Sequence, residues 1–221
     1  MPLTLPYFQL FLQENKAFGM NQTITKQDIL PLDAYLKIRP QKQKEIMEVK
    51  KLRRVPIGPD MTFYFESYDT IWWQIHEMLR IEKGGDDQIQ DELQAYATLI
   101  PKRHPDQSQE LVATMMIEID DMIRRRETLA QLGGIEETIF LSFQNTEIKG
   151  VPETDLDRTD ETGKTSSVHF IHFLLGKADI ESFIQPGQDV ILEVRHPLYS
   201  HKTLLSDSTR QTLSKDLLFY R

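Results

Sequence analysis

The second half of the chain is a succession of strand-like segments joined by turns, and this pattern constrains the fold more than any other feature. Apolar and β-branched residues recur along positions 137–144, 147–151, 167–175 and 189–195. Earlier in the chain, apolar side chains alternate along 111–119 with the period of two that is typical of a strand. Successive strands joined by turns favour antiparallel pairing over the parallel sheets of strict strand–helix alternation. The sequence therefore predicts an α+β fold with a mainly antiparallel sheet and several packed amphipathic helices.

The clearest helical pattern spans residues 70–83. Asp69 can cap its start, Gly84 and Gly85 end it, and an apolar stripe follows one side. The stripe consists of Ile71, Trp72, Ile75, Met78 and Leu79. Further helices are predicted at 32–54, where Pro40 interrupts the pattern, at 88–98, between Asp120 or Asp121 and Gly133, at 178–183 and at 208–218.

A capping-box pattern at Thr25 and Asp28 marks the expected start of the ordered domain. We therefore expect an N-terminal extension, residues 1–21, and a single α+β domain, residues 22–221, which could divide into lobes at 22–134 and 135–221. Residues 1–19 lack the basic start of a secretory signal and could instead reflect a misassigned start. No apolar stretch approaches the roughly 18 residues needed to cross a bilayer. The expected location is the cytoplasm, without membrane association.

The chain of 221 residues contains no cysteine. This excludes disulfides, a thiol nucleophile, zinc sites that use cysteine, and an iron–sulfur cluster held by this chain alone. Glycine-rich dinucleotide-binding and serine-hydrolase motifs are also missing. Gly163-Lys164-Thr165 has the end of a phosphate-binding loop but follows an acidic stretch, which would repel phosphate. The cofactor is therefore unknown, and a metal ion remains possible.

The histidines offer a candidate metal site. Glu193 and His196 form the one Glu-x-x-His pattern of the chain, but on a predicted strand, where positions three apart face opposite sides. His76-Glu77 starts a zinc-protease pattern that has Arg80 in place of its second histidine. The residues that could still converge as ligands are His169, His172, His196 and His201. The alternative is that these are ordinary core and surface histidines.

Polar residues interrupt the apolar stripe of the helix at 70–83. Glu82 projects between Ile75 and Met78 on the helical wheel, and Gln74 lies at the edge of the stripe. Because a buried carboxylate needs hydrogen-bond or charge partners, we expect a polar pocket that includes residues of neighbouring strands. Its candidate residues are Glu66, Gln74, Glu77, Arg80, Glu82 and Glu118. They could form a structural hydrogen-bond network, or a metal or proton-transfer site.

Positive charge is concentrated between positions 37 and 54. The net charge of the chain is −8, but this segment carries eight basic and two acidic residues, so the remainder carries −14. The candidate contact residues for an acidic protein partner or an anion are Lys50, Lys51, Arg53, Arg54 and the non-stripe residue Trp73. The alternative is a solvated helix face whose cations suit the helix dipole. Nucleic acid is not expected, because the overall charge is negative and no aromatic residues interleave the cluster.

Five short segments carry a family resemblance. They are RRVPIGP at 53–59, FE at 65–66, QIHEMLRIE at 74–82, HPLY at 196–199 and LSKDL at 213–217. Together they resemble an uncharacterised bacterial protein family known only as a domain of unknown function, over residues 22–221. The resemblance implies genes beside those of rubrerythrin and an iron–sulfur oxidoreductase, and hence a link to peroxide defence or anaerobic electron transfer. It assigns no catalytic residue, and gene neighbourhood is not a mechanism.

Two functional hypotheses follow from these observations. The first is a non-catalytic accessory or interaction protein of a redox or oxidative-stress system, in contact with an acidic redox protein that holds the cofactor. The second is a metal-binding protein or metal-dependent enzyme that uses the Glu, Gln and His candidates. The sequence does not decide whether the protein is an enzyme, and it allows a homo-oligomer.

Overall fold

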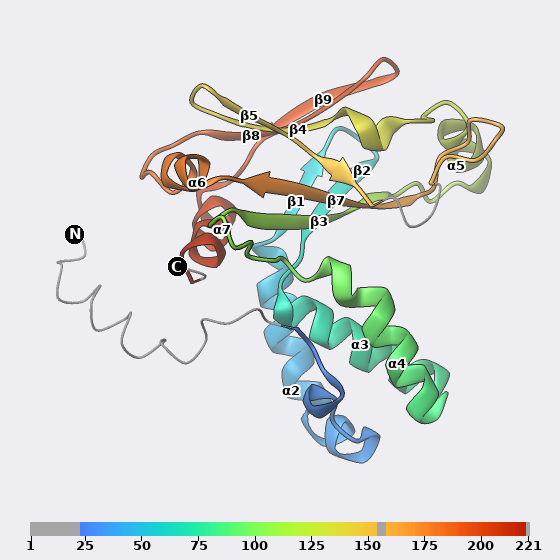
Figure 1. The fold of residues 1–221 in the computed structure, drawn as a ribbon. Coiled ribbons are helices and arrows are strands. Elements are labelled where there is room, and N and C mark those ends of the chain that lie inside the picture. Colours follow the sequence, from blue (N-terminus) through green and yellow to red (C-terminus); the bar gives the residue numbers. More distant parts are fainter. Residues whose placement is uncertain (1–22, 154–157, 220–221) are drawn as a thin grey trace, which may run out of the picture.

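The computed structural model describes residues 23–153 and 158–219, which form two antiparallel sheets packed face to face (Figure 1). Sheet A has the strand order β1 (Arg54–Ile57), β2 (Met61–Phe65), β3 (Gln109–Ile117), β7 (Val168–Leu175) and β6 (Val151–Pro152). Sheet B has the order β5 (Thr146–Lys149), β4 (Ile139–Phe143), β8 (Val190–His196) and β9 (Tyr199–Leu204). The α+β fold with antiparallel sheets is therefore confirmed.

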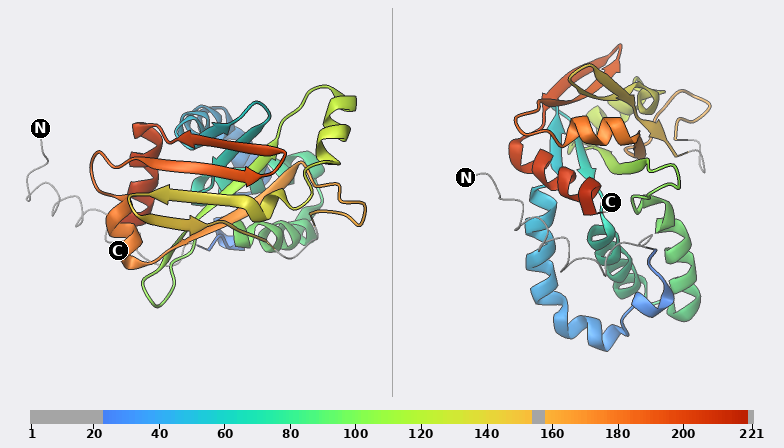
Figure 2. Two further views of the ribbon diagram at one scale, coloured as in Figure 1. Left: turned by 90° about the horizontal axis from the view of Figure 1, so that it is seen from above. Right: turned by 60° about the vertical axis from the view of Figure 1, so that its left-hand side comes forward.

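A layer of helices covers the side of sheet A that faces away from sheet B (Figures 1 and 2). It consists of α2 (Leu32–Lys51), α3 (Tyr68–Glu82) and α4 (Gly85–Tyr96), with the short 3₁₀ turns η2 (Lys26–Asp28) and η3 (Ala97–Leu99). The other helical elements border the sheets: α5 (Met122–Leu129), η4 (Ile135–Thr138), α6 (Lys177–Phe183) and α7 (Asp207–Phe219). None of the helices in 23–153 and 158–219 is long and apolar enough to cross a membrane.

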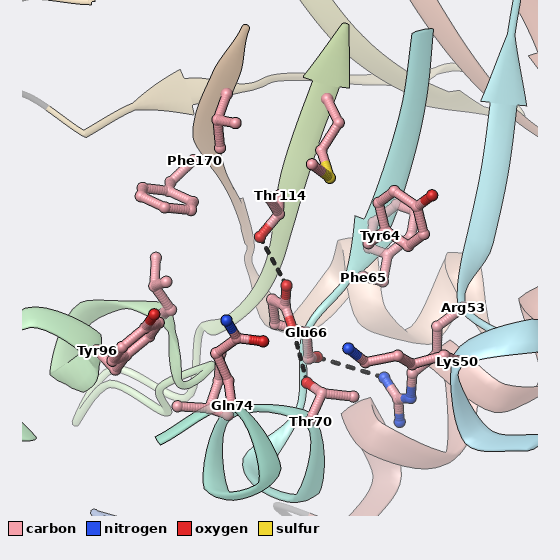
Figure 3. A pocket seen from close by; sticks show the side chains of 14 residues that line it. Lys50, Arg53, Tyr64, Phe65, Glu66, Thr70, Gln74, Tyr96, Thr114 and Phe170 are labelled. Carbon is pink, nitrogen blue, oxygen red and sulfur yellow. Dashed lines mark hydrogen bonds between the residues drawn. The ribbon is translucent and has the colours of Figure 1, made fainter. Parts of the chain in front are cut away.

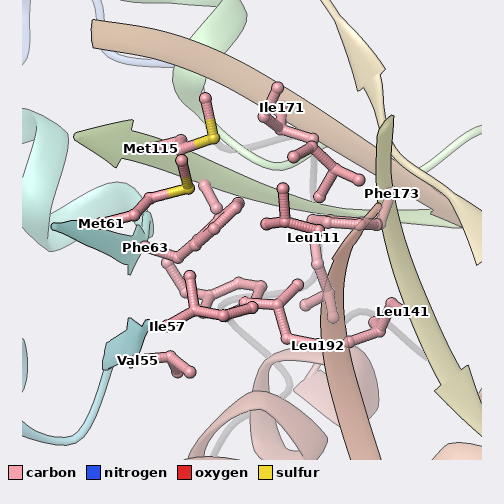
Figure 4. Packing of buried hydrophobic residues seen from close by; sticks show 14 of the residues in the cluster. Val55, Ile57, Met61, Phe63, Leu111, Met115, Leu141, Ile171, Phe173 and Leu192 are labelled. Carbon is pink, nitrogen blue, oxygen red and sulfur yellow. The ribbon is translucent and has the colours of Figure 1, made fainter. Parts of the chain in front are cut away.

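Strand β3 packs on both of its faces. One face points toward sheet B and supplies four residues of the main core, each at most 4% exposed (Figure 4). They are Leu111, Ala113, Met115 and Ile117. On the opposite face, Val112 packs with Ile71 and Ile75 of α3. Burial of apolar side chains on both faces fixes the register of β3, because a slip by one residue would exchange the two sets.

The N-terminal capping box forms, but it does not begin the long helix. Asp28 Oδ2 accepts hydrogen bonds from the backbone nitrogen and the hydroxyl of Thr25, at 2.8 and 2.7 Å. Only the turn η2 follows, and α2 begins after Pro31. Helix α2 then continues through Pro40, and its ribbon bends in its first half (Figure 2).

Two other features go beyond the sequence expectation. Strand β9 was not expected, because its central residues are exposed and polar and show no apolar alternation. Sheet A joins β3 to β7, so the possible lobes 22–134 and 135–221 share one sheet and one core. The extension at 1–21 lies outside the residues that the structure describes.

A buried ion pair connects α7 to the start of sheet A. Arg53 is 6% exposed and donates from Nη1 and Nη2 to the two carboxylate oxygens of Asp216, at 2.7 and 2.8 Å. Burial raises the pKa of Asp216, and the charge of Arg53 opposes that rise. The pair spans 163 positions of sequence, so it ties the C-terminal helix to the first strand.

We predict that Asp216→Ala lowers the free energy of unfolding by about 3–5 kcal/mol, because it leaves the Arg53 charge buried without a partner. Equilibrium unfolding in urea measures the change. Glu48→Ala is the matched control: it removes an exposed partner of Lys51 and should cost less than about 1 kcal/mol. Equally small effects of the two substitutions would contradict a structural role for the buried pair.

Candidate functional site

A cavity of about 440 Å³ lies between the helical layer and sheet A (Figure 3). Its walls come from the last turn of α2 and the segment that joins it to β1, from β2, α3, α4 and η3, and from β3 and β7. The polar lining residues are Lys50, Arg53, Tyr64, Glu66, Thr70, Gln74, Tyr96 and Thr114. The apolar lining residues are Phe65, Ile71, Leu99, Met116, Val168 and Phe170.

Glu66 lies at the point where the chain leaves β2 and turns into α3. Its Oε1 accepts a hydrogen bond from the Thr114 hydroxyl, and its Oε2 accepts one from the Thr70 hydroxyl, both at 2.6 Å (Figure 3). Thr70 is held in place because the Ser67 backbone nitrogen donates to its hydroxyl oxygen at 2.8 Å. Two neutral hydroxyl groups therefore orient this carboxylate, and no Lys, Arg or His of the described residues lies within 4.0 Å of it. Each oxygen keeps capacity to accept a further hydrogen bond.

The two cations that line the cavity differ in their surroundings. Arg53 is neutralised by Asp216, and its Nη1 also donates to the backbone oxygen of Glu66 at 3.3 Å. Lys50 extends into the cavity from the last turn of α2 (Figure 3). Among the described residues it has no hydrogen-bond or ion-pair partner. Lys50 is therefore the cation in the cavity that is free to meet a ligand.

Aromatic and apolar side chains make up the rest of the wall. Phe170 of β7 and Tyr96 at the end of α4 both line the cavity. Burial raises the pKa of the Tyr96 hydroxyl, and the nearby Gln74 side chain partly offsets this. Met116 and Leu99 extend the apolar surface. The cavity thus combines one carboxylate, one amide and one ammonium group with an apolar surface, the usual composition of a small-molecule site.

Glu77 and Arg80 belong to a different cluster, between α2 and α3. The Glu77 carboxylate accepts hydrogen bonds from the Tyr35 hydroxyl and the Arg39 guanidinium at 2.8 Å, and from Arg80 at 3.1 Å. The Arg39 guanidinium, with smaller help from Arg80 and Tyr35, holds the pKa of Glu77 at about 2 against the effect of burial. This network fastens α2 to α3 and does not line the cavity.

Glu82 and Glu118 also lie outside the cavity. Glu82 accepts a hydrogen bond from Gln88 Nε2 at 2.9 Å, because α4 folds back over the end of α3. Glu118 accepts hydrogen bonds from the Thr62 hydroxyl at 2.7 Å and the Tyr64 hydroxyl at 2.9 Å. Of the six residues predicted to share one pocket, only Glu66 and Gln74 line the cavity. Glu77 and Arg80 pair with each other and, through Glu77, with α2, whereas Glu82 and Glu118 have partners on α4 and β2.

The four candidate metal ligands have different neighbours. His169 is fully buried beside Thr165, and His172 lies between Glu110 and Glu153, at 3.8 and 3.5 Å. His196 Nε2 lies 3.3 Å from the backbone oxygen of Gly133, and His201 packs against the ring of Tyr199. Within residues 23–153 and 158–219, no group of three or more His, Asp or Glu side chains is arranged to hold a metal ion. The predicted histidine cluster therefore does not form there.

Two of the five candidate contact residues are buried, which corrects their assignment to a surface. Trp73 is 8% exposed because α2 covers it, with the Tyr35 ring at a centroid distance of 5.9 Å and Ile46 in the same cluster. Arg53 is enclosed by its ion pair with Asp216. Each of these two side chains therefore contacts a distant segment of its own chain rather than a partner protein.

The other three candidate contact residues have separate environments. Lys51 is exposed and pairs with Glu48 at 2.6 Å. Arg54 lies over the Tyr64 ring and 3.6 Å from Glu118. Lys50 lines the cavity. The charged segment is thus not one continuous contact surface.

The sequence pattern did not single out most of the lining residues, among them Thr70, Tyr96, Thr114 and Phe170. Thr114 and Phe170 are direct partners in the β3–β7 register. The sequence does contain a signal for this face of β3. Val112, Thr114 and Met116 alternate with the core residues of the strand, yet none of the three is charged. Such a strand has a second covered face.

Comparisons with known proteins give a family and a structural neighbour. The family described as "Protein of unknown function (DUF3501)" matches residues 23–217. The crystal structure of a protein of unknown function from Burkholderia pseudomallei is similar, with 37% identity and a TM-score of 0.79. The match covers 88% of this chain and 99% of that one. No curated protein matches. The resemblance to a domain of unknown function is therefore confirmed, without any activity attached to it.

The Glu77 network predicts a specific dependence of stability on pH. Because the folded-state pKa of about 2 lies below the ordinary 4.5, the ionised carboxylate stabilises the fold above pH 4.5, and this contribution is lost as the pH falls toward 2. Glu77→Gln should cost about 2 kcal/mol at pH 7 and almost nothing near pH 2. Urea unfolding across this range tests it. Glu45→Gln, at an exposed pair with Lys42, should change the free energy of unfolding little at any pH.

Proposed function

Because the chain belongs to the DUF3501 family of proteins of unknown function, we propose a function from the cavity itself: the protein binds a small organic molecule between its helical layer and sheet A. The observation that carries this proposal is the environment of the Glu66 carboxylate. Its carboxylate is oriented by the hydroxyls of Thr70 and Thr114 at 2.6 Å and has no cation within 4.0 Å among the described residues. It faces a cavity with mostly apolar walls.

A purely structural carboxylate in such a place would be expected to have a charged partner, because desolvating an ion without a counter-ion is costly. The chain shows this arrangement elsewhere, at Asp216 with Arg53 and at Glu77 with Arg39. Glu66 is held by neutral donors, which fix its direction and leave its charge available. A ligand that donates hydrogen bonds would complete the site.

Binding is favoured over catalysis by the chemistry of the lining. The lining residues include no histidine, and the two threonine hydroxyls donate to the carboxylate, so they are not activated as nucleophiles. The apolar walls and the few directed polar groups suit recognition.

Filling the cavity should block binding. Val168→Phe adds a ring inside it, whereas Leu174→Phe adds the same ring on the same face of β7 at an exposed position outside it. We expect aromatic fragments to shift the backbone amide NMR signals of Gln74 and Thr114 in the wild type and in Leu174→Phe. In Val168→Phe the affinity should fall about tenfold or more, which is about 1.4 kcal/mol or more. Equal binding by all three proteins would contradict the proposal.

We also propose, as a second role, that helix α2 contacts an acidic redox protein, as the resemblance in sequence suggests. One observation favours this role. Lys37 and Lys44 are exposed and have no ion-pair partner among the described residues, and Leu36 and Met47, 48% and 54% exposed, lie beside them on the helix. These four residues span about 100° of the helix surface. An apolar strip bordered by cations suits a partner with an acidic rim.

The second role predicts association that is sensitive to salt. Purified rubrerythrin from the same genome is the bait, and binding to the wild type should weaken as the salt concentration rises. Lys37→Glu with Lys44→Glu should reduce the affinity about tenfold. The matched control, Lys177→Glu with Lys202→Glu, makes the same charge change at other exposed positions. An equal loss of affinity in both double variants, or no association of the wild type with the bait, would count against this role.

A further inference from the structure

Two opposite charges line the cavity without neutralising each other. The Glu66 carboxylate is held by hydroxyl groups, and the Lys50 ammonium group has no ion-pair partner within 4.0 Å among the described residues. They enter from different elements, Glu66 from the end of β2 and Lys50 from the end of α2 (Figure 3). Water can solvate both groups while the cavity is empty. A ligand that displaces this water must replace it with complementary charge at both positions.

The charge balance narrows the class of ligand. Arg53 is already neutralised by Asp216 at 2.7 and 2.8 Å, so Lys50 is the unpaired cation of the lining. A phosphate that carries two negative charges would exceed this single cation and would be repelled by Glu66. A ligand with only a positive charge would leave Lys50 desolvated and unpaired. A ligand with one positive and one negative group matches the two unpaired charges of the site.

The walls of the cavity indicate the chemistry of the uncharged part of the ligand. Phe170, Tyr96, Leu99 and Met116 present an aromatic and aliphatic surface, and the volume of about 440 Å³ suits a compact molecule. Gln74 can accept or donate a hydrogen bond beside Tyr96. An apolar side chain on a charged head group would therefore lie against these walls.

Building on the ligand-binding role, we propose that the cavity recognises a zwitterion of the α-amino acid type with an apolar side chain. The ligand ammonium group donates to Glu66, in the lone-pair directions that Thr70 and Thr114 leave open. Its carboxylate pairs with Lys50, and its side chain packs on Phe170 and Tyr96.

Four phenyl compounds separate the contributions of the two charges. They are L-phenylalanine, 2-phenylethylamine, 3-phenylpropanoate and 3-phenylpropan-1-ol, each titrated into the full chain at pH 7 by calorimetry and by NMR. L-phenylalanine should bind about tenfold or more tightly than each of the other three, since each of the two charge pairs adds affinity. L-leucine should bind as well, because the walls require an apolar side chain and do not require a ring.

Two substitutions assign each charge to its residue. In Glu66→Gln, the advantage of L-phenylalanine over 3-phenylpropanoate should disappear. In Lys50→Met, the affinity advantage of L-phenylalanine over 2-phenylethylamine should disappear. Lys51→Met, at the next residue but outside the cavity, should leave all affinities unchanged. Circular dichroism confirms that each variant is folded.

The outcomes distinguish this inference from the ligand-binding role. If the alcohol or a singly charged compound binds as tightly as L-phenylalanine, and Val168→Phe blocks it, the cavity binds ligands but the zwitterion assignment is wrong. If aromatic fragments bind and neither amino acid does, the assignment is likewise wrong. If no compound binds and Val168→Phe changes nothing, both proposals fail.

Discussion

The antiparallel pairing of β3 with β2 on one side and β7 on the other is the constraint on which the rest of the structure depends. β3 and β7 pair along eight residues, from Gln109 opposite Leu175 to Met116 opposite Val168. This pairing joins the first and second halves of the chain in one sheet. Because β3 buries residues on both faces, one register places alternate side chains in the core with sheet B and the others under the helical layer.

The cavity is a direct consequence of that register. Tyr64 on β2, Thr114 on β3 and Phe170 on β7 are partners across three neighbouring strands, so they form one row on the face under the helices. Glu66 follows two positions after Tyr64, where the chain turns into α3 and brings Thr70 back to the same carboxylate. Strand pairing and a helix start therefore meet at Glu66, which explains how residues 48 positions apart can orient one side chain.

Local periodicity was enough to predict most elements and the antiparallel α+β class, because each of those strands and helices carries its own apolar pattern. It failed where the pattern depends on a distant partner. Strand β9 is exposed along its middle and is defined by pairing with β8. Trp73 lies outside the apolar stripe of its own helix, yet α2 buries it. Of the predicted pocket residues, Glu66 and Gln74 lie together in the cavity. Thr70 joins them from the first turn of α3, four positions after Glu66, whereas Thr114, Tyr96 and Phe170 are brought there only by tertiary structure.

The positive segment at 37–54 shows why a count of charges cannot assign a role. Arg53 is buried and neutralised by Asp216, so its charge contributes to the fold. Lys50, three residues earlier in the last turn of α2, reaches the cavity without an ion-pair partner among the described residues. Lys37 and Lys44 lie on the exposed side of the same helix. What separates these roles is the exposure of each cation and its distance to the nearest carboxylate. Both are set by the packing of α2 on α3 and of α7 on sheet A rather than by the segment itself.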